Sequence, residues 1–122
     1  MGDDNKTRGD LTKLIDALRT IADGLGEGAT VERVLALLTI SYHTQVNKGI
    51  DQNELARVSE TSPSTMSRNV AALSDIGDRG RTPLNMIEVR FDPTDRRRRI
   101  VSTNHKGDAL VNKALARLTG RK

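Results

Sequence analysis

The chain has 122 residues, a length that suits one domain with a short tail. Hydrophobic residues make up 35% of it and charged residues 30%, so its core must be small. The absence of cysteine excludes disulfides, thiolate metal sites and cysteine nucleophiles, and two aromatic residues are too few for a base-stacking platform. No apolar run is long enough for a transmembrane helix or a signal peptide, so we expect a cytoplasmic protein without a membrane partner.

The charge is unevenly distributed along the chain. Residues 1–60 contain 7 Lys/Arg against 10 Asp/Glu, a net charge of −3, whereas residues 61–122 contain 13 against 6, a net charge of +7. Seven of the arginines lie between positions 79 and 99. An arginine-rich segment suits a phosphate surface because guanidinium groups bind phosphate oxygens in pairs. On charge alone, a solvated polar face that keeps a small protein soluble is as good an interpretation as a phosphate-binding surface.

The first half of the chain has helical spacing. Residues 1–9 are polar and unpatterned and are predicted to form a disordered leader, followed by a single domain over residues 10–122. Apolar residues at three- and four-residue steps predict a first helix from Asp10 that ends at Gly24 or Gly26. A second helix, apolar on more than one face, is expected to begin after Thr30 and to fray at 47–49.

Two short helices are predicted next. Asp51 is expected to cap the first, with Glu54 reaching back to it in a capping box and an end near Ser59. Ser62 and Pro63 suit the first positions of the following helix, which is expected to end at Gly77. That helix carries its large apolar side chains on one face, which is suited to a core. Its other face has small polar residues and Arg68.

From residue 86 the period changes to two. Ile87, Val89 and Phe91 alternate with polar residues, which predicts a half-buried strand. Residues 92–95 have the composition of a turn, and a returning strand follows over 99–103. Asn104 is expected to cap a last helix with an apolar stripe over 110–118. The prediction is therefore a mainly α fold with a small antiparallel β-hairpin, a winged helix-turn-helix of order α-α-α-α-β-β-α.

This arrangement has a physical logic for double-stranded DNA. The polar face of the helix after Ser62 has no bulky side chain, so it can enter a major groove, and its N-terminus favours phosphate. Four consecutive arginines beside the predicted turn repel one another unless bound phosphates relieve the repulsion. Asp95 can orient one of them and leave the others free. The alternative is that the helix after Ser62 is an ordinary surface helix in a small helical bundle.

The same segments resemble the MarR family of bacterial winged-helix regulators. Glu54-Leu55-Ala56 followed by residues 62–68 is similar to the family's helix-turn-helix, and residues 87–97, with Gly107 beyond them, are similar to its wing. The resemblance covers roughly residues 30–118. It implies a homodimer that binds a pseudo-palindromic operator, with Ser64, Thr65 and Arg68 facing the major groove. It also implies that Arg97 enters the minor groove and that Asp95 positions it.

The sequence departs from that pattern in three places. Thr103-Asn104 replaces the usual Leu-Thr pair after the wing, which weakens the strand's expected core contact. Residues 78–86 form an insertion of about nine residues, either an extra phosphate contact or a tolerated loop. The C-terminal part is short, so a dimer must rely on two apolar stripes, and the alternative is that both stripes pack within their own protomer. The predicted dimer residues are Leu11, Leu14, Ile15, Leu18, Leu110, Val111, Leu115 and Leu118.

The sequence-based hypothesis is a DNA-binding transcriptional regulator, acting as a homodimeric repressor and not as an enzyme. The predicted DNA-binding residues are Ser62, Ser64, Thr65, Ser67, Arg68, Arg79, Arg81, Asp95, Arg96, Arg97, Arg98 and Arg99. No metal site is expected, because His43 and His105 have no ligand-spaced neighbours. No catalytic group or cofactor is expected, because Ser64 and Ser67 lack a base partner and the sequence has no Gly-rich nucleotide loop. A small-molecule effector near Tyr42 and His43 is left open. Two alternatives are a protein-interaction module that binds an acidic partner and a DNA-binding protein that ignores sequence.

Overall fold

The computed structural model describes residues 2–120. Its elements in chain order are α1 (Gly2–Leu25), a 3-10 turn η1 (Gly26–Gly28), α2 (Val31–Asn47), β1 (Ile50–Asp51), α3 (Gln52–Val58), α4 (Pro63–Leu73), β2 (Ile87–Asp92), β3 (Asp95–Thr103) and α5 (His105–Thr119). Helices dominate and a small sheet is present, so the predicted fold class is confirmed. Among these residues no helix combines the length and the apolar character needed to cross a membrane.

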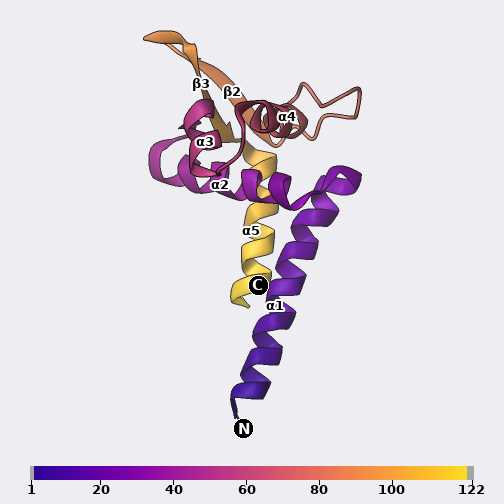
Figure 1. The fold of residues 1–122 in the computed structure, drawn as a ribbon. Helices are drawn as coiled ribbons and strands as arrows, with labels where there is room; N and C mark the ends of the chain where they lie inside the picture. Colours follow the sequence, from indigo (N-terminus) through magenta and orange to yellow (C-terminus); the bar gives the residue numbers. More distant parts are fainter. Residues whose placement is uncertain (1, 121–122) are drawn as a thin grey trace.

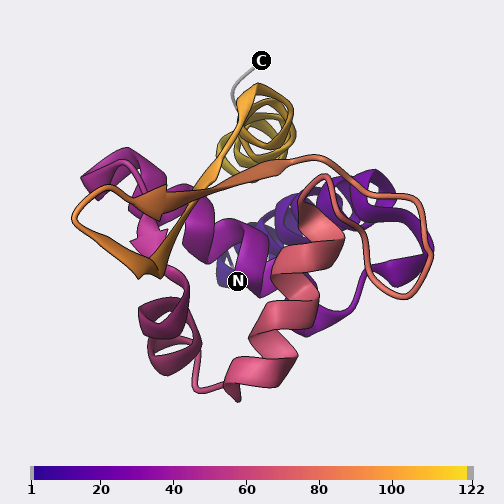
Figure 2. The same cartoon turned by 90° about the horizontal axis from the view of Figure 1, so that it is seen from above.

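The elements form a head and a stalk. Helices α1 and α5 run side by side away from the rest of the molecule, with the N-terminus at the far end of the stalk (Figure 1). Helices α2, α3 and α4 and the sheet make up the head. The β2–β3 hairpin and the 74–86 loop project from the head on opposite sides of α4 (Figures 1 and 2). The hairpin and α4 therefore share the end of the molecule that lies away from the stalk.

The core lies where α2 is enclosed by the other helices and the sheet. Leu37 and Ile40 of α2 are fully buried, as are Leu55 of α3, Leu73 of α4 and Val101 of β3. Ile21 of α1 and Ala114 of α5 bring the upper part of the stalk into the same cluster. Burial of these side chains supplies the main stabilising term of a small domain. The second helix is therefore the central one, as the sequence predicted.

Side-chain caps set the helix starts that the sequence predicted. Thr30 accepts a hydrogen bond from the Arg33 N–H at the start of α2, and Asp51 accepts from two backbone N–H groups at the start of α3. Asn104 accepts from the Gly107 N–H at the start of α5. The proposed reciprocal half of the α3 capping box is wrong. Glu54 instead accepts two hydrogen bonds from the Arg57 guanidinium, which lowers the pKa of Glu54 and raises the pKa of Arg57.

Two predicted helix ends are also wrong. Helix α1 begins at Gly2 and not at Asp10, because extending an existing helix adds one hydrogen bond per residue without needing apolar contacts. The predicted disordered leader is thus helical from Gly2, and residue 1 lies outside the described residues. Helix α4 ends at Leu73 and not at Gly77, because the Ser74 hydroxyl takes the Ile76 N–H in place of a helical carbonyl.

The sheet has three strands in the order β1-β3-β2, all antiparallel. Strand β1 was missed because two residues are too few to show a period. Gly49 before it has a φ of 140°, and a Cβ there would lie 2.8 Å from the Val101 carbonyl oxygen, so this close approach requires glycine. Within the hairpin, Ile87 pairs with Thr103 and Phe91 with Arg99.

The hairpin extends further from the core than predicted. Ile87 is buried, but Val89 and Phe91 are exposed, so the expected half-buried strand is confirmed at its inner end alone. The outer part of β2 projects past the helices and has little to pack against. Thr103 is buried at the inner end of β3, where its N–H donates to the Thr44 hydroxyl at 2.9 Å. The Thr103 hydroxyl donates to Asp108 Oδ1 at 2.5 Å, so the Thr that departs from the family pattern is accommodated by a hydrogen bond to α5.

Candidate nucleic-acid interface

Helix α4 presents a polar face at the end of the head. Ser62 caps it by accepting from the Thr65 N–H at 3.1 Å, and Pro63 occupies the first helical position. Met66, Val70 and Leu73 are buried, which fixes the rotation of the helix. Ser64, Ser67 and Arg68 consequently face solvent and Thr65 is half-buried. The structure therefore brings the predicted residues of this helix together on one exposed, small-residue face.

The hairpin tip is built around a bulge. Phe91 pairs with Arg99 and Asp92 pairs with Asp95, so β3 has three additional residues, 96–98, that lack cross-strand partners. A bulge bends its strand and changes the direction of its side chains. The period of the sequence could not show this irregularity, because four successive arginines have no alternation.

Asp95 holds Arg97 at the tip. Its Oδ1 accepts a hydrogen bond from the Arg97 backbone N–H at 3.0 Å and another from Arg97 Nε at 3.3 Å. The Arg97 side chain is nevertheless 92% exposed, and its terminal nitrogens form no other ion pair in the described part of the chain. The guanidinium is thus oriented from one edge while its outer edge remains available. This geometry is expected of an arginine that is oriented to contact a phosphate group or a DNA groove.

The other tip arginines differ from one another. Arg98 lies 3.4 Å from Asp92 Oδ2 and 3.5 Å from Asp51 Oδ1, a buried oxygen that has no hydrogen bond. Arg98 therefore ties the hairpin to the start of α3 and is not free in this structure. The Arg99 guanidinium lies 6.0 Å from the centre of the Phe91 ring, within the range of a cation–π contact. Arg96 is exposed.

Asp92 shapes the turn that carries these arginines. The Thr94 N–H donates to Asp92 Oδ1 at 2.9 Å and the Thr94 hydroxyl donates to the same oxygen at 2.7 Å. These bonds, with a smaller contribution from Arg98, lower the pKa of Asp92. The turn is therefore stabilised by an ionised carboxylate at neutral pH.

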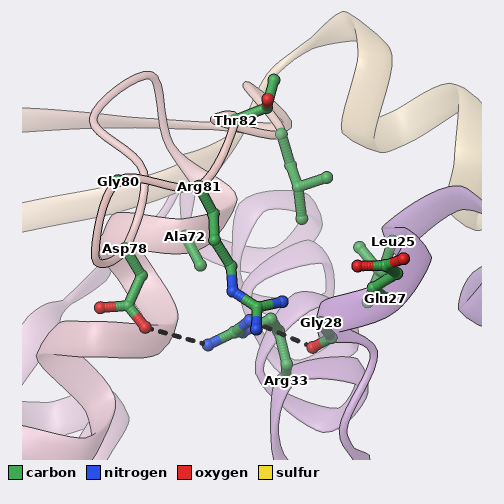
Figure 3. A pocket seen from close by; sticks show the side chains of 10 residues that line it. Leu25, Glu27, Gly28, Arg33, Ala72, Asp78, Gly80, Arg81 and Thr82 are labelled. Atoms are coloured by element: carbon green, nitrogen blue, oxygen red, sulfur yellow. Dashed lines mark hydrogen bonds and ion pairs between the residues drawn. The ribbon is translucent and has the colours of Figure 1, made fainter.

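The arginines of the 78–86 insertion point in different directions. Arg79 is exposed at the turn, where its φ is 53°. Arg81 extends back toward Arg33 into a cavity of about 470 Å³ between the loop and the end of α1 (Figure 3). Asp78 lies beside the same cavity and pairs with Arg33 and Arg68. Tyr42 and His43, suggested as an effector site, pack edge to face elsewhere on α2 and do not line this cavity.

The predicted dimer residues fall into two groups. Leu11, Leu14, Ile15 and Leu18 of α1 and Leu115 and Leu118 of α5 are between 39% and 52% exposed. Val111 is buried in the core of its own chain, and Leu110 is partly buried against Gly24. The stalk therefore carries an exposed apolar surface at the end opposite the hairpin, without the contribution expected from Val111.

Comparison with solved structures identifies the architecture. The chain superposes on MarR with a TM-score of 0.61 at 26% identity, covering 89% of this chain and 72% of MarR. It superposes on Staphylococcus aureus MepR in a complex with DNA with a TM-score of 0.63 at 19% identity, covering 98% and 81% of the two chains. The chain has the MarR-type winged-helix fold. In that fold α3 and α4 form the helix-turn-helix and the β2–β3 hairpin is the wing.

The likeness to MarR-type proteins is one of structure, and the sequence identities are low. A point mutant of S. aureus MepR matches with a TM-score of 0.62 at 22% identity over 76% of this chain, which spans 61% of that protein. No protein-family model matches the sequence, and no curated protein matches it. At such identities the likeness supports the fold, whereas the contacts of individual side chains depend on the geometry of this chain.

Sequence reasoning missed the network behind the helix-turn-helix. Arg33, Asp78 and Asn69 meet although 45 positions separate the first two, and no spacing rule links such distant residues. One signal was present: Arg33 lies four and seven residues before Leu37 and Ile40 and therefore on an apolar face of α2. A charged residue in a helix that is expected to be central requires a partner, because burying an unpaired charge is costly.

Proposed function

We propose that this protein is a sequence-specific double-stranded DNA-binding transcriptional regulator that acts as a homodimer. In this proposal α4 enters the major groove, the wing tip enters the neighbouring minor groove, and the bound dimer represses transcription by occupying its operator. The cation-rich wing and the polar face of α4 contact DNA, whereas the exposed leucines of the stalk contact the second protomer.

The observation that carries the proposal is the arrangement of the wing tip and α4. Arg97 is exposed and oriented by Asp95. The hairpin that carries it lies at the same end of the head as α4 (Figure 1). Arg98 and Arg99 make contacts within the chain, but a structural role does not account for four consecutive arginines, since their charges repel. A polyanion relieves that repulsion, and release of its counterions contributes to affinity. MepR, a protein of the same fold, has been solved in a complex with DNA, which supports DNA as the polyanion.

The stalk supports the dimer. Four large apolar residues of α1 and two of α5 are about half exposed along one end of a chain whose core is small. A monomer would leave this surface in water, where it favours association. A two-fold dimer would cover it with the same surface of the second copy. The two heads would then read two half-sites spaced about 34–36 Å apart, one helical turn of DNA.

Arg97→Ala tests the wing. We expect it to weaken binding to a duplex selected by the parent chain from random sequences by about 1–3 kcal/mol without unfolding the protein. The salt dependence of the affinity should become shallower as well, because each lost phosphate contact lowers the slope by about one. Fluorescence anisotropy titrations at several salt concentrations measure both quantities.

The matched control is Arg19→Ala, which removes the same charge from an exposed position on the stalk. Its affinity and salt slope should match those of the parent chain. Equal affinities for the parent and the Arg97→Ala variant would refute the assignment of the wing. A parent chain that selects no duplex at all would refute DNA recognition itself.

A further inference from the structure

The 78–86 insertion contacts α4 in two ways: the backbone N–H groups of Leu84 and Met86 donate to carbonyl oxygens at the end of the helix, and the Asp78 carboxylate forms an ion pair with Arg68. Asp78 belongs to the loop between α4 and β2. This loop projects on the side of α4 opposite the wing (Figure 2). Its Oδ2 lies 3.5 Å from an Nη2 atom of Arg68 and 3.7 Å from the Nη2 atom of Arg33. The Asp78 side chain is 14% exposed. One shielded carboxylate thus lies between an arginine of α2 and an arginine of the polar face of α4.

Arg33 provides a fixed anchor for this carboxylate. Its Nε donates to Asn69 Oδ1 at 3.1 Å. Its Nη1 donates to the Gly28 carbonyl oxygen at 3.1 Å (Figure 3). The Arg33 side chain is 12% exposed. Because hydrogen bonds to η1 and α4 restrain the guanidinium, it is a stationary positive charge that holds Asp78 in place.

Arg68 is restrained less and faces outward. Its side chain is 52% exposed, and Asp78 is its ion-pair partner among the described residues. An arginine has several rotatable bonds, so ordering it on DNA costs conformational entropy. A carboxylate that holds one side of the guanidinium reduces that cost and leaves the other edge for a base. Bidentate hydrogen bonding of arginine to the O6 and N7 atoms of guanine depends on such alignment.

From this geometry we infer that Asp78 is a positioning residue for Arg68, and that the insertion therefore sets base specificity on α4. The inference rests on the proposed DNA recognition. The loop acts through Asp78, which transmits the fixed position of Arg33 to the side chain that reads the base. Asp78 itself does not contact DNA, since its exposed surface is small and its charge would repel phosphate.

The test compares four forms of this chain on duplexes selected from random sequence. Arg68→Ala identifies the base pair read by Arg68 as the position whose preference disappears. We expect Asp78→Asn, which removes the charge at constant shape, to lower the preference at that same position by about ten-fold. Asp75→Asn is the matched control, because it removes the same charge from an exposed position two residues after α4. Its base preferences should equal those of the parent chain.

Two further measurements separate positioning from a purely structural role. Asp78→Glu retains the carboxylate and should restore part of the preference, whereas a structural role predicts that the longer side chain is tolerated no better than Asn. Without DNA, the Nε–H resonance of Arg68 should shift in Asp78→Asn and remain unchanged in Asp75→Asn. The Arg68 resonance can still be measured if Asp78→Asn lowers the stability of the protein, so it tests the positioning role in that case as well.

The outcomes distinguish this inference from the proposed function. A parent chain that selects a sequence, together with an Asp78→Asn variant that retains the full preference at the Arg68 position, overturns the inference and leaves DNA recognition intact. Loss of preference equally at all positions assigns Asp78 a general structural role and also overturns it. A parent chain that selects no sequence overturns both.

Discussion

Gly107→Ala tests how α5 is joined to the winged-helix head. Gly107 is buried in the first turn of α5, and a Cβ at this position would lie 2.2 Å from the Met86 carbonyl oxygen. That oxygen also accepts the Asn104 N–H at 3.0 Å, and the Asn104 side chain in turn accepts the Gly107 N–H at 3.0 Å. Because the obstructing atom belongs to the backbone just before β2, the variant must move α5 away from the sheet.

The magnitude follows from what that movement disrupts. Inserting a methyl group into a packed site costs about 1–3 kcal/mol. The backbone bond and the cap at Asn104 contribute about 1 kcal/mol each. Alanine gains about 1 kcal/mol over glycine as a helix former. The free energy of unfolding should therefore fall by about 2–4 kcal/mol, a large part of the stability of a domain of this size.

Urea unfolding followed by circular dichroism measures this change. Gly9→Ala is the matched control, because a Cβ at Gly9 in α1 meets no atom within 4 Å and should raise stability by up to about 1 kcal/mol. All variants must be compared at one protein concentration, because association stabilises the folded state. If Gly107→Ala were as stable as Gly9→Ala, the described packing of α5 against the start of β2 would be wrong.

Two further predictions concern the stalk and the turn of the wing. Leu14→Asp should convert the dimer into a monomer, because it places a charge in the exposed apolar surface of α1. The control variant Thr12→Asp should leave the dimer intact. Light scattering measures both, and a monomeric parent chain would contradict the dimer. Thr94→Ala should raise the pKa of Asp92 in a carboxyl NMR titration, although not to its ordinary value, because the backbone N–H of residue 94 remains as a donor. Since the pKa of Asp92 is lowered by folding, its contribution to stability is complete above the ordinary carboxylate pKa and disappears as the pH falls through the folded value. An unchanged Asp92 titration in Thr94→Ala would exclude the hydroxyl as a cause.

Local signals in the sequence predicted much of the fold. The caps at Thr30, Asp51, Ser62 and Asn104 are determined by a side chain and a backbone N–H two or three residues later, so a single sequence shows them. The change from helical to two-residue spacing located the hairpin for the same reason. The start of α1 was missed because its first turns have no apolar stripe to reveal them.

The sequence predicted which residues form the candidate interface better than it predicted the contacts that they make. The Asp95–Arg97 contact joins neighbours in the chain, and the sequence indicated it. The links from Arg98 to Asp51 and from Asp78 to Arg33 join elements that are brought together by tertiary packing alone. Both links change the interpretation of a predicted DNA contact, because one restrains Arg98 and the other lies behind Arg68. Such pairings depend on the packed fold and not on spacing along the chain.

The central claim is recognition of a particular double-stranded sequence, and the ratio of two dissociation constants tests it most directly. The parent chain is titrated at physiological salt with a duplex that it has selected from random sequences and with a scrambled duplex of the same composition. The account predicts tighter binding to the selected duplex by about 1,000-fold or more. Equal affinities that fall together as salt rises would contradict it and would indicate binding to the DNA backbone without regard to sequence.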